Sequence, residues 1–229
     1  MKLAELIRSL PKVSISPSRI PDIKINDLTT DSRLVTPDSL FVAIPGFKTD
    51  GHRYLQEVVS KGVRAVVVEK KEGLPESVVQ IVVPESRSAL AFISCEFYRH
   101  PSKELVLVGV TGTNGKTTTT YLLESIFQEA GFKPGVMGTV NYRFGGTTLA
   151  APHTTPEAYE FQSMLRQMRA RGVTHVVCEV SSHALSLHRV DGSHFNAALF
   201  TNLSQDHLDF HEDFENYFPF FLISLRFDF

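Results

Sequence analysis

The sequence predicts an α/β protein, in which a small N-terminal α/β domain is followed by a second domain built on a mostly parallel sheet. Three observations support this prediction. Short apolar strand patterns alternate with helical patterns up to about residue 100. An apolar run at 105–110 leads through a glycine-rich turn into a helical pattern. Strand and helix patterns then alternate again as far as residue 200.

The first hundred residues contain the elements of a domain of their own. Leucine and isoleucine recur at helical spacing over residues 1–10, so we predict a helix there. His100-Pro101-Ser102 breaks the alternation, and we place the boundary there, which gives domains 1–100 and 101–229. The other predicted elements are a strand at 40–44, a helix at 52–61, strands at 65–68 and 78–83, and a helix at 85–99.

The second domain opens with a strand at 105–110 and a helix at 116–130, which Gly131 ends. Thr155 is predicted to cap a helix that has Pro156 at its first position and runs to about residue 171. The remaining elements are a strand at 135–140, a hairpin or loop at 141–150, and strands at 173–180 and 195–200.

The last stretch, residues 218–229, is atypical. It reads FPFFLISLRFDF and has no helical period. Two interpretations stay open: a buried terminal strand, or an end that is truncated or altered in frame.

Composition limits the classes of function. Hydrophobic residues make up 42% and charged residues 21%, as in ordinary soluble proteins. The formal net charge of -2 gives no basic footprint for nucleic acid. No window approaches the ~18 apolar residues that a membrane span needs, and the N-terminus lacks a signal-peptide pattern. Cys95 and Cys178 lie in apolar patterns typical of buried reduced thiols, so we expect a reducing cytosol.

The segment GVTGTNGKT at 109–117 stands between a strand and a helix, where a phosphate-binding loop belongs. Backbone amides converge on phosphate oxygens there, and the helix N-terminus adds partial positive charge. Lys116 can reach the β- and γ-phosphates, and the Thr117 hydroxyl can hold Mg²⁺. The strict pattern is not met, because Val110 stands where its first glycine should be. The second domain is therefore predicted as a P-loop-type ATPase domain.

Glu179 is predicted at the carboxyl end of a strand near this loop, where a carboxylate can coordinate the Mg²⁺ of a nucleotide. Ser181-Ser182-His183 does not indicate a hydrolase, because no G-x-S-x-G turn and no third residue accompany it. A His and Asp cluster around His207 is a weak metal signal when taken alone.

Together these motifs resemble the Mur ligases. The segments GVTGTNGKTTT at 109–119, EVSSHAL at 179–185, HRV at 188–190 and TNLSQDHLDFH at 201–211 are similar to the family's central ATPase domain. Residues 30–33 (TDSR) and 38–54 (DSLFVAIPGFKTDGHRY) resemble the uridine-nucleotide domain of the member that adds the third residue of the peptidoglycan stem peptide. The family's own phosphate loop has the glycine spacing seen here. The resemblance covers about residues 25–217.

The resemblance implies an ATP-dependent amide ligase of cell-wall synthesis. Its substrates are UDP-N-acetylmuramoyl-L-alanyl-D-glutamate and a free amino acid, with meso-diaminopimelate favoured over L-lysine. ATP and Mg²⁺ are the implied cofactors, the reaction passes through an acyl phosphate, and the protein is expected to be cytoplasmic and monomeric. Neither nucleic acid nor membrane insertion is expected.

Site residues carry over by matching position. Lys116, Glu179 and His207 are the implied catalytic residues, and Thr117, Glu179 and His207 the implied metal ligands. The ATP-binding set is Gly112, Thr113, Asn114, Gly115, Lys116, Thr117 and Thr118. The substrate-binding set is Thr30, Ser32, Phe47, Lys48, Thr49, His153, Thr154, Thr155, Ser181 and Arg189.

Three departures set further expectations. The family has a third domain that binds the incoming amino acid, and these residues contain none. Phe221 stands at the position where the family has a carbamylated lysine that binds Mg²⁺, and Leu187 and His153 replace residues that are polar Gln or Asn in some relatives. Because of the missing domain, Phe221 and the apolar stretch 218–229, we expect the central domain to be incomplete and this chain alone to be inactive. The alternatives are a non-catalytic fragment that binds UDP-sugar or ATP, another Mur ligase or folylpolyglutamate synthetase, and a generic P-loop NTPase.

Overall fold

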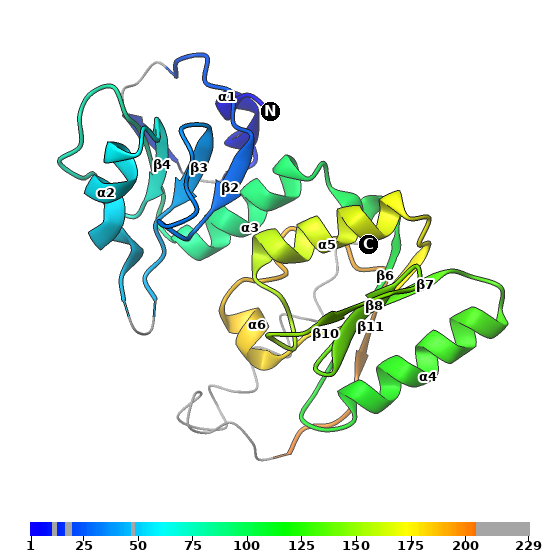
Figure 1. Cartoon of the computed structure of the whole chain (residues 1–229). Helices are drawn as coiled ribbons and strands as arrows, with labels where there is room; N and C mark the ends of the chain where they lie inside the picture. The colour runs from blue at the N-terminus through cyan, green and yellow to red at the C-terminus, as the bar shows by residue number, and fades with distance from the viewer. Residues whose placement is uncertain (11–12, 17–19, 47–48, 205–229) are drawn as a thin grey trace. The chain divides into compact units, whose positions relative to one another are not determined.

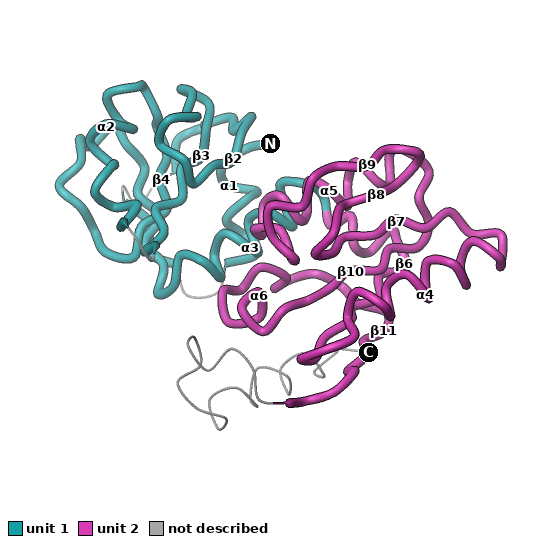
Figure 2. The backbone as a smooth tube through the Cα atoms, turned by 60° about the horizontal axis from the view of Figure 1, so that its bottom comes forward, with its two compact units in different colours: residues 1–99 teal, residues 100–229 magenta. Residues whose placement is uncertain are grey.

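The computed structural model describes residues 1–10, 13–16, 20–46 and 49–204. The chain divides into two compact units, Met1–Arg99 and His100–Phe229, and each has its own sheet (Figure 2). The predicted α/β class is confirmed, because helices alternate with strands in both units and most strand pairs are parallel.

The first unit has a five-stranded sheet in the order β1-β5-β4-β3-β2. Only β1 runs antiparallel to its neighbour. The strands are β1 (Ser14–Ser16), β2 (Asp27–Thr29), β3 (Ser39–Val42), β4 (Ala65–Val68) and β5 (Val79–Val82). The helices are α1 (Leu3–Leu6), η1 (Gly51–Tyr54), α2 (Leu55–Ser60) and α3 (Ser86–Phe97).

Both faces of this sheet are covered by the unit's own residues. Phe41 and Val66 pack with Leu55 and Val58 of α2. The residues that alternate with them along the strands, such as Leu40, are buried as well, as expected for a parallel sheet. The unit therefore has a hydrophobic core of its own.

The helix predicted over residues 1–10 is wrong in length, because α1 covers only Leu3–Leu6. The chain start is tied to a neighbouring segment instead: the Leu3 amide donates to the Ile23 carbonyl, and the Ile25 amide to that of Met1. Strands β1 and β2, each of three residues, were not predicted, since so short a run shows no clear period.

The second unit has a six-stranded sheet in the order β11-β6-β10-β7-β8-β9. Strands β11, β6, β10 and β7 are parallel, and β8 and β9 add an antiparallel hairpin. The strands are β6 (Val106–Thr111), β7 (Pro134–Met137), β8 (Asn141–Phe144), β9 (Thr147–Ala150), β10 (His175–Glu179) and β11 (Ala197–Phe200). The helices are η2 (Pro101–Glu104), α4 (Lys116–Glu129), α5 (Ala158–Ala170) and α6 (Ser182–Ser186).

Helices α4 and α5 lie on opposite faces of this sheet (Figure 1). Phe161, Leu165 and Met168 of α5 pack against Leu107 and Val176 of the central strands. On the other face, α4 contacts β6, β7 and β10, and Thr120 is its one fully buried residue. The central strands β6 and β10 are therefore covered by a helix on each face of the sheet.

The carboxyl ends of four parallel strands meet at one edge of the second sheet. The segments that follow them are 112–115 after β6, 138–139 after β7, Val180 and Ser181 after β10, and 201–204 after β11. Ligands of open α/β sheets bind at this edge. The topology therefore brings the predicted phosphate loop next to Glu179.

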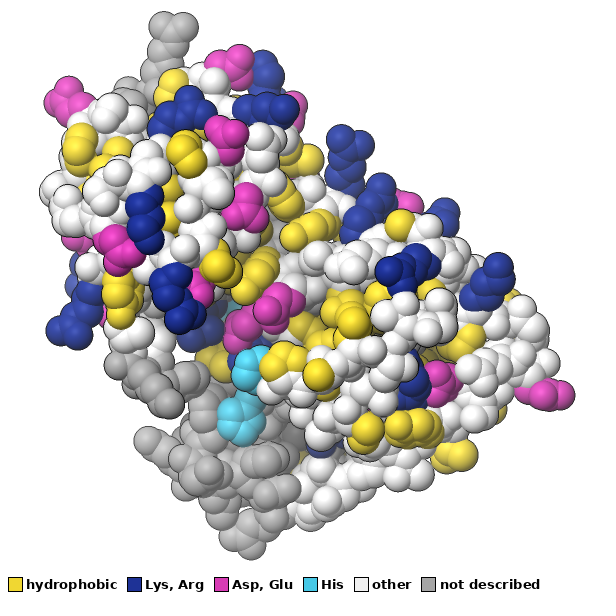
Figure 3. All heavy atoms as spheres, viewed as in Figure 1, with side chains coloured by type: hydrophobic (Ala, Val, Ile, Leu, Met, Phe, Trp, Pro, Cys, Tyr) yellow, Lys and Arg dark blue, Asp and Glu magenta, His cyan; other side chains and the backbone are white. Residues whose placement is uncertain are grey.

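The surface carries mixed charge. On the face drawn in Figure 3, acidic and basic side chains are interspersed, in keeping with a net charge of -2. Across the described ranges, none of the helices combines the length and apolar character needed to cross a membrane.

Candidate functional site

The phosphate loop connects β6 to α4. Gly112 has φ 123° and Gly115 has φ 83°, a backbone region that side chains with a Cβ rarely adopt. Gly115 is the N-cap of α4, so the amides of residues 116–118 point out of the helix start without a preceding helical carbonyl. This end of the helix is a ready anion site.

The segment after β11 packs against the loop. A Cβ built on Gly112 would lie 2.3 Å from Thr201 Oγ1 and 2.8 Å from the Asn202 carbonyl oxygen. The Thr113 amide donates to the Asn202 carbonyl at 2.9 Å, and the Asn114 amide donates to Asn202 Oδ1 at 3.0 Å. Two amides of the predicted phosphate set, those of Thr113 and Asn114, are thus bonded to Asn202 in this structure.

Lys116 folds back over the loop. Its Nζ donates to the carbonyl oxygens of Gly112 at 2.7 Å and Thr113 at 2.9 Å. The ammonium group is therefore held at the mouth of the loop, where phosphate oxygens would compete for its protons.

Glu179 is the last residue of β10, as predicted, and its side chain is 1% exposed. Thr117 Oγ1 donates to Glu179 Oε2 at 3.0 Å. A buried carboxylate and a hydroxyl that face each other beside a phosphate loop are oxygen ligands of the kind that Mg²⁺ takes together with phosphate and water. The described residues therefore fit the predicted metal position at Thr117 and Glu179.

Thr139 also binds Glu179, and it was not predicted. Its amide donates to Glu179 Oε1 at 3.1 Å, and its Oγ1 donates to Oε2 at 3.0 Å. A Cβ on Gly138 would lie 2.3 Å from Oε1, so only glycine lets the chain approach this closely. The strand predicted over 135–140 ends at Met137 for this reason.

The predicted substrate loop contacts Glu179 as well, through the backbone of that residue. Thr155 Oγ1 donates to the Glu179 carbonyl at 2.8 Å and accepts from the Ser181 amide at 3.2 Å. The predicted helix cap at Thr155 is therefore wrong, because its hydroxyl is used here. Helix α5 begins at Ala158 with Glu157 as its N-cap.

Arg189 is anchored beneath this loop. Its Nη1 donates to the Thr155 carbonyl at 2.9 Å, and its Nη2 pairs with Glu157 Oε1 at 2.5 Å. The buried Nε has no hydrogen-bond partner among the described residues. Ser181 lies nearby, where its Oγ caps α6 by accepting from the Ala184 amide at 3.1 Å. The Thr155 carbonyl and the Glu157 carboxylate thus hold both terminal nitrogens of the guanidinium beside the predicted substrate loop.

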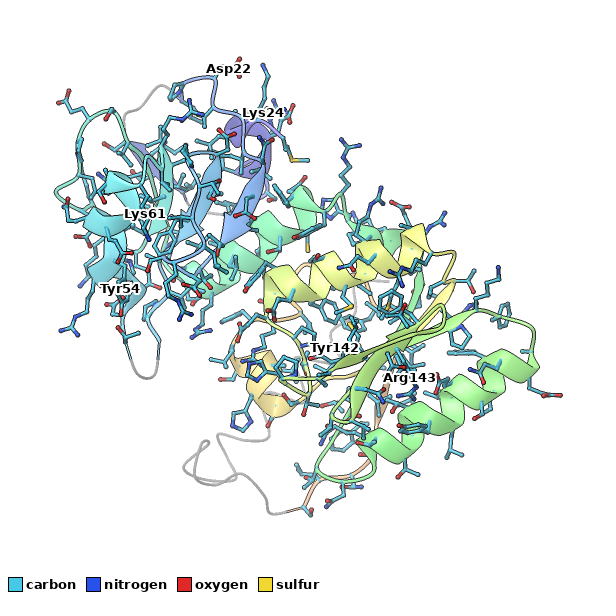
Figure 4. The ribbon with its side chains drawn as sticks, viewed as in Figure 1. Asp22, Lys24, Tyr54, Lys61, Tyr142 and Arg143 are labelled. Atoms are coloured by element: carbon cyan, nitrogen blue, oxygen red, sulfur yellow. The ribbon has the colours of Figure 1, made fainter. Side chains whose placement is uncertain are left out.

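Tyr142 on β8 supports the loop from the hairpin (Figure 4). Its hydroxyl donates to the His153 carbonyl. Burial raises the pKa of Tyr142 to about 12, so the hydroxyl keeps its proton for this bond. The His153 side chain itself is exposed.

The predicted uridine residues lie in the first unit. Ser32 is buried, and its carbonyl accepts from Lys61 Nζ at 2.8 Å. Thr49 Oγ1 lies 3.3 Å from the Tyr54 hydroxyl, and Figure 4 labels Tyr54 and Lys61. Hydrogen bonds from Arg33 lower the pKa of Asp31, beside Thr30, to about 2.

Several predicted positions lie outside the described residues: Phe47, Lys48, His207, Phe221 and the stretch 218–229. Within the described ranges, no three His, Cys, Asp or Glu side chains gather as a metal cluster.

Comparisons with known proteins agree with these motifs. Residues 24–98 match the family described as Mur ligase family, catalytic domain, and residues 110–222 match the Mur ligase middle domain. The chain belongs to the Mur ligase family.

Named Mur ligases are similar along most of the chain. The UDP-N-acetylmuramoyl-L-alanyl-D-glutamate--2,6-diaminopimelate ligase of Geobacter metallireducens is 47% identical over 196 residues, which are 86% of this chain and 38% of the relative. A solved structure of a ligase with that name has a TM-score of 0.78 at 27% identity and covers 92% of this chain and 44% of that one. The MurF ligase of Thermotoga maritima, solved with ADP, has a TM-score of 0.56 at 21% identity, over 87% of this chain and 43% of that one, and supports the fold alone. The chain thus spans less than half the length of these proteins.

Proposed function

We propose that this chain contributes the UDP-sugar-binding domain, residues 1–100, and the ATP-binding domain, residues 101–229, of an ATP-dependent ligase of peptidoglycan synthesis. The proposed reaction joins the third amino acid to UDP-N-acetylmuramoyl-L-alanyl-D-glutamate. The names of the relatives favour meso-diaminopimelate over L-lysine as that amino acid.

One observation carries the proposal: Glu179 is shared by the nucleotide loop and the substrate loop. Its carboxylate binds Thr117, which follows the phosphate loop, and its backbone carbonyl binds Thr155. Transfer of the γ-phosphate to a substrate carboxylate requires both reactants within a few ångströms in a fixed orientation. The two loops on either side of Glu179 give such a meeting point.

In the first proposed step, a D-glutamate carboxylate oxygen attacks the γ-phosphorus of ATP. The bond to the β–γ bridging oxygen breaks, and ADP leaves. Two anions must approach each other, so positive groups are needed where charge develops. Lys116 and the amides at the start of α4 supply them, and Arg189 holds a carboxylate of the dipeptide. Mg²⁺ at Thr117 and Glu179 would neutralise phosphate charge.

In the second proposed step, the amine of the incoming amino acid attacks the acyl phosphate carbon. The amide bond forms, phosphate leaves with the electrons of the broken carbon–oxygen bond, and the amine loses a proton. Thr154, Thr155 and Ser181 hold the dipeptide in place during both steps. Thr30, Ser32 and Thr49 are proposed to bind the uridine end, together with Phe47 and Lys48.

The proposed setting is the bacterial cytoplasm, where ATP and UDP-sugars are available. Cys95 and Cys178 are both buried, as is usual for the thiols of proteins in a reducing compartment. Burial raises the pKa of Cys178, so this thiol is not the nucleophile of the reaction. We propose a monomer that acts in cell-wall growth and division and binds no nucleic acid.

Calorimetry with the full chain tests the proposal. We expect binding of ATP with Mg²⁺ and, separately, of UDP-N-acetylmuramoyl-L-alanyl-D-glutamate. The corresponding UDP-muramoyl tripeptide and a folate are the competing ligands. A preference for the tripeptide would indicate another Mur ligase, and a preference for folate would indicate a folylpolyglutamate synthetase.

A matched pair of variants tests whether Thr154 contacts the dipeptide. Thr154→Val removes a hydroxyl of the proposed substrate loop, whereas Thr148→Val removes an exposed hydroxyl of β9. The first should weaken dipeptide binding about three- to tenfold, the effect of one neutral hydrogen bond that the Thr154 oxygen accepts from the dipeptide, and the second should not. Equal dipeptide affinities in both variants would remove Thr154 from the site.

A further inference from the structure

We propose that Thr139 is a positioning residue that holds Glu179 in its metal-binding orientation and connects it to the substrate loop. This inference rests on the proposed function and deepens it. Neither the loop motif nor the strand pattern indicated this residue. It follows β7, two residues beyond the end of the strand.

Thr139 sets the orientation of the Glu179 carboxylate. Thr139 donates to both oxygens of Glu179, through its amide at 3.1 Å and its hydroxyl at 3.0 Å. Two donors from one residue fix the plane of the carboxylate as well as its position. The close backbone approach at Gly138, 2.3 Å from Oε1 to a hypothetical Cβ, shows that this turn is built around Glu179.

Thr139 also connects Glu179 to Thr154. Thr139 Oγ1 lies 3.1 Å from Thr154 Oγ1. The Thr139 hydroxyl has one proton and donates it to Glu179, so Thr154 must donate to Thr139. A chain therefore runs from the Thr154 hydroxyl through Thr139 to the carboxylate, and it joins the substrate loop to the nucleotide site.

Thr139 can hold Glu179 independently of Thr117. Thr117 Oγ1 donates to Glu179 Oε2 at 3.0 Å. If Thr117 and Glu179 ligated the same cation, the Thr117 hydroxyl would turn a lone pair toward the cation and its proton away from the carboxylate. Among the described hydrogen bonds to the carboxylate, those from Thr139 are independent of Thr117. Partners of this kind, behind the ligands, orient a metal site.

Nucleotide binding with and without Mg²⁺ tests this role. The readout is the gain in affinity for a non-hydrolysable ATP analogue when Mg²⁺ is added, measured by calorimetry on the full chain. Thr139→Val keeps the backbone donor and the shape but lacks the hydroxyl. We expect its Mg²⁺-dependent gain to fall about ten- to a hundredfold, with little change in metal-free affinity. Thr139→Ser should restore the gain, and Thr148→Val is the matched control.

A Thr139→Val protein with the wild-type Mg²⁺ gain would overturn the inference and leave the proposed function standing. An equal loss in Thr148→Val, or no recovery in Thr139→Ser, would also overturn it, because the effect would not depend on this hydroxyl. If the wild-type chain bound the analogue with no Mg²⁺-dependent gain, the proposed metal site would fail and the inference with it.

Discussion

Replacing Glu179 by glutamine separates its proposed metal role from its structural role. The carboxylate accepts three hydrogen bonds, one from Thr117 Oγ1 and two from Thr139. In Glu179→Gln the amide oxygen can keep the bond to the Thr139 amide, and the amide nitrogen can donate to the hydroxyls after they rotate. Neutral bonds are each weaker by about 1 kcal/mol, but the charge no longer has to be buried. We therefore expect a change in unfolding free energy below about 2 kcal/mol.

The effect on metal binding should be much larger. Loss of a charged ligand should lower the Mg²⁺-dependent gain in ATP affinity by at least about a hundredfold, because removal of a supporting partner alone costs ten- to a hundredfold. Calorimetry with ATP at several Mg²⁺ concentrations, together with urea unfolding, measures both quantities. Glu129→Gln, at the exposed end of α4, is the control. A folded Glu179→Gln protein with wild-type Mg²⁺ dependence would refute the metal assignment.

Three further predictions address other parts of the chain. Lys116→Ala should weaken ATP binding by about 1.5–3 kcal/mol in a folded protein, as measured by calorimetry, whereas Lys133→Ala should leave it unchanged; equal affinities would remove Lys116 from the site. The pKa of Asp31 is lowered from 3.8 to about 2 by Arg33, so its stabilising effect is present above about pH 4 and is lost as pH falls toward about 2. Urea unfolding at about pH 6 and about pH 3 should show a smaller decrease for Asp31→Asn than for the wild type; equal decreases would contradict this. Residues 1–99, which have their own core, should fold alone and show UDP-dependent NMR shifts around Ser32 and Thr49, and a lack of such shifts would disprove the uridine placement.

Strong periodic patterns made much of the fold predictable from sequence. The strand predicted at 65–68 is β4, with the same bounds, and the helix predicted at 116–130 is α4, which ends one residue earlier. Elements whose ends depend on tertiary contacts were less accurate. The strand at 135–140 is shorter than predicted because the chain turns at Gly138 toward Glu179, and no local pattern reports that contact.

Some residues of the candidate site were likewise predictable from sequence, and others were not. Lys116, Thr117 and Glu179 stand in motifs whose chemistry shows in the sequence, and the structure brings Thr117 and Glu179 into contact. Thr139, Tyr142 and Glu157 carry no such motif. They became visible only when the fold placed a hydroxyl or a carboxylate beside a partner 11 to 40 positions away in the chain. The same holds for the start of α5. Thr155 has the sequence features of an N-cap, but its hydroxyl donates to the Glu179 carbonyl instead.

The departure of the phosphate loop from the strict pattern has a structural reason. Val110, which stands where that pattern has its first glycine, lies inside β6, is fully buried, and pairs with Leu199 and Glu179 of the flanking strands. A glycine there would remove a packed side chain and provide no needed freedom. The freedom is needed two residues later, where Gly112 has a positive φ and the chain after β11 leaves no room for a Cβ. Gly112 leaves space for Thr201 and Asn202. Asn202 in turn accepts hydrogen bonds from the amides of Thr113 and Asn114. The position of that glycine is set by the neighbouring strand as much as by the phosphate it is proposed to bind.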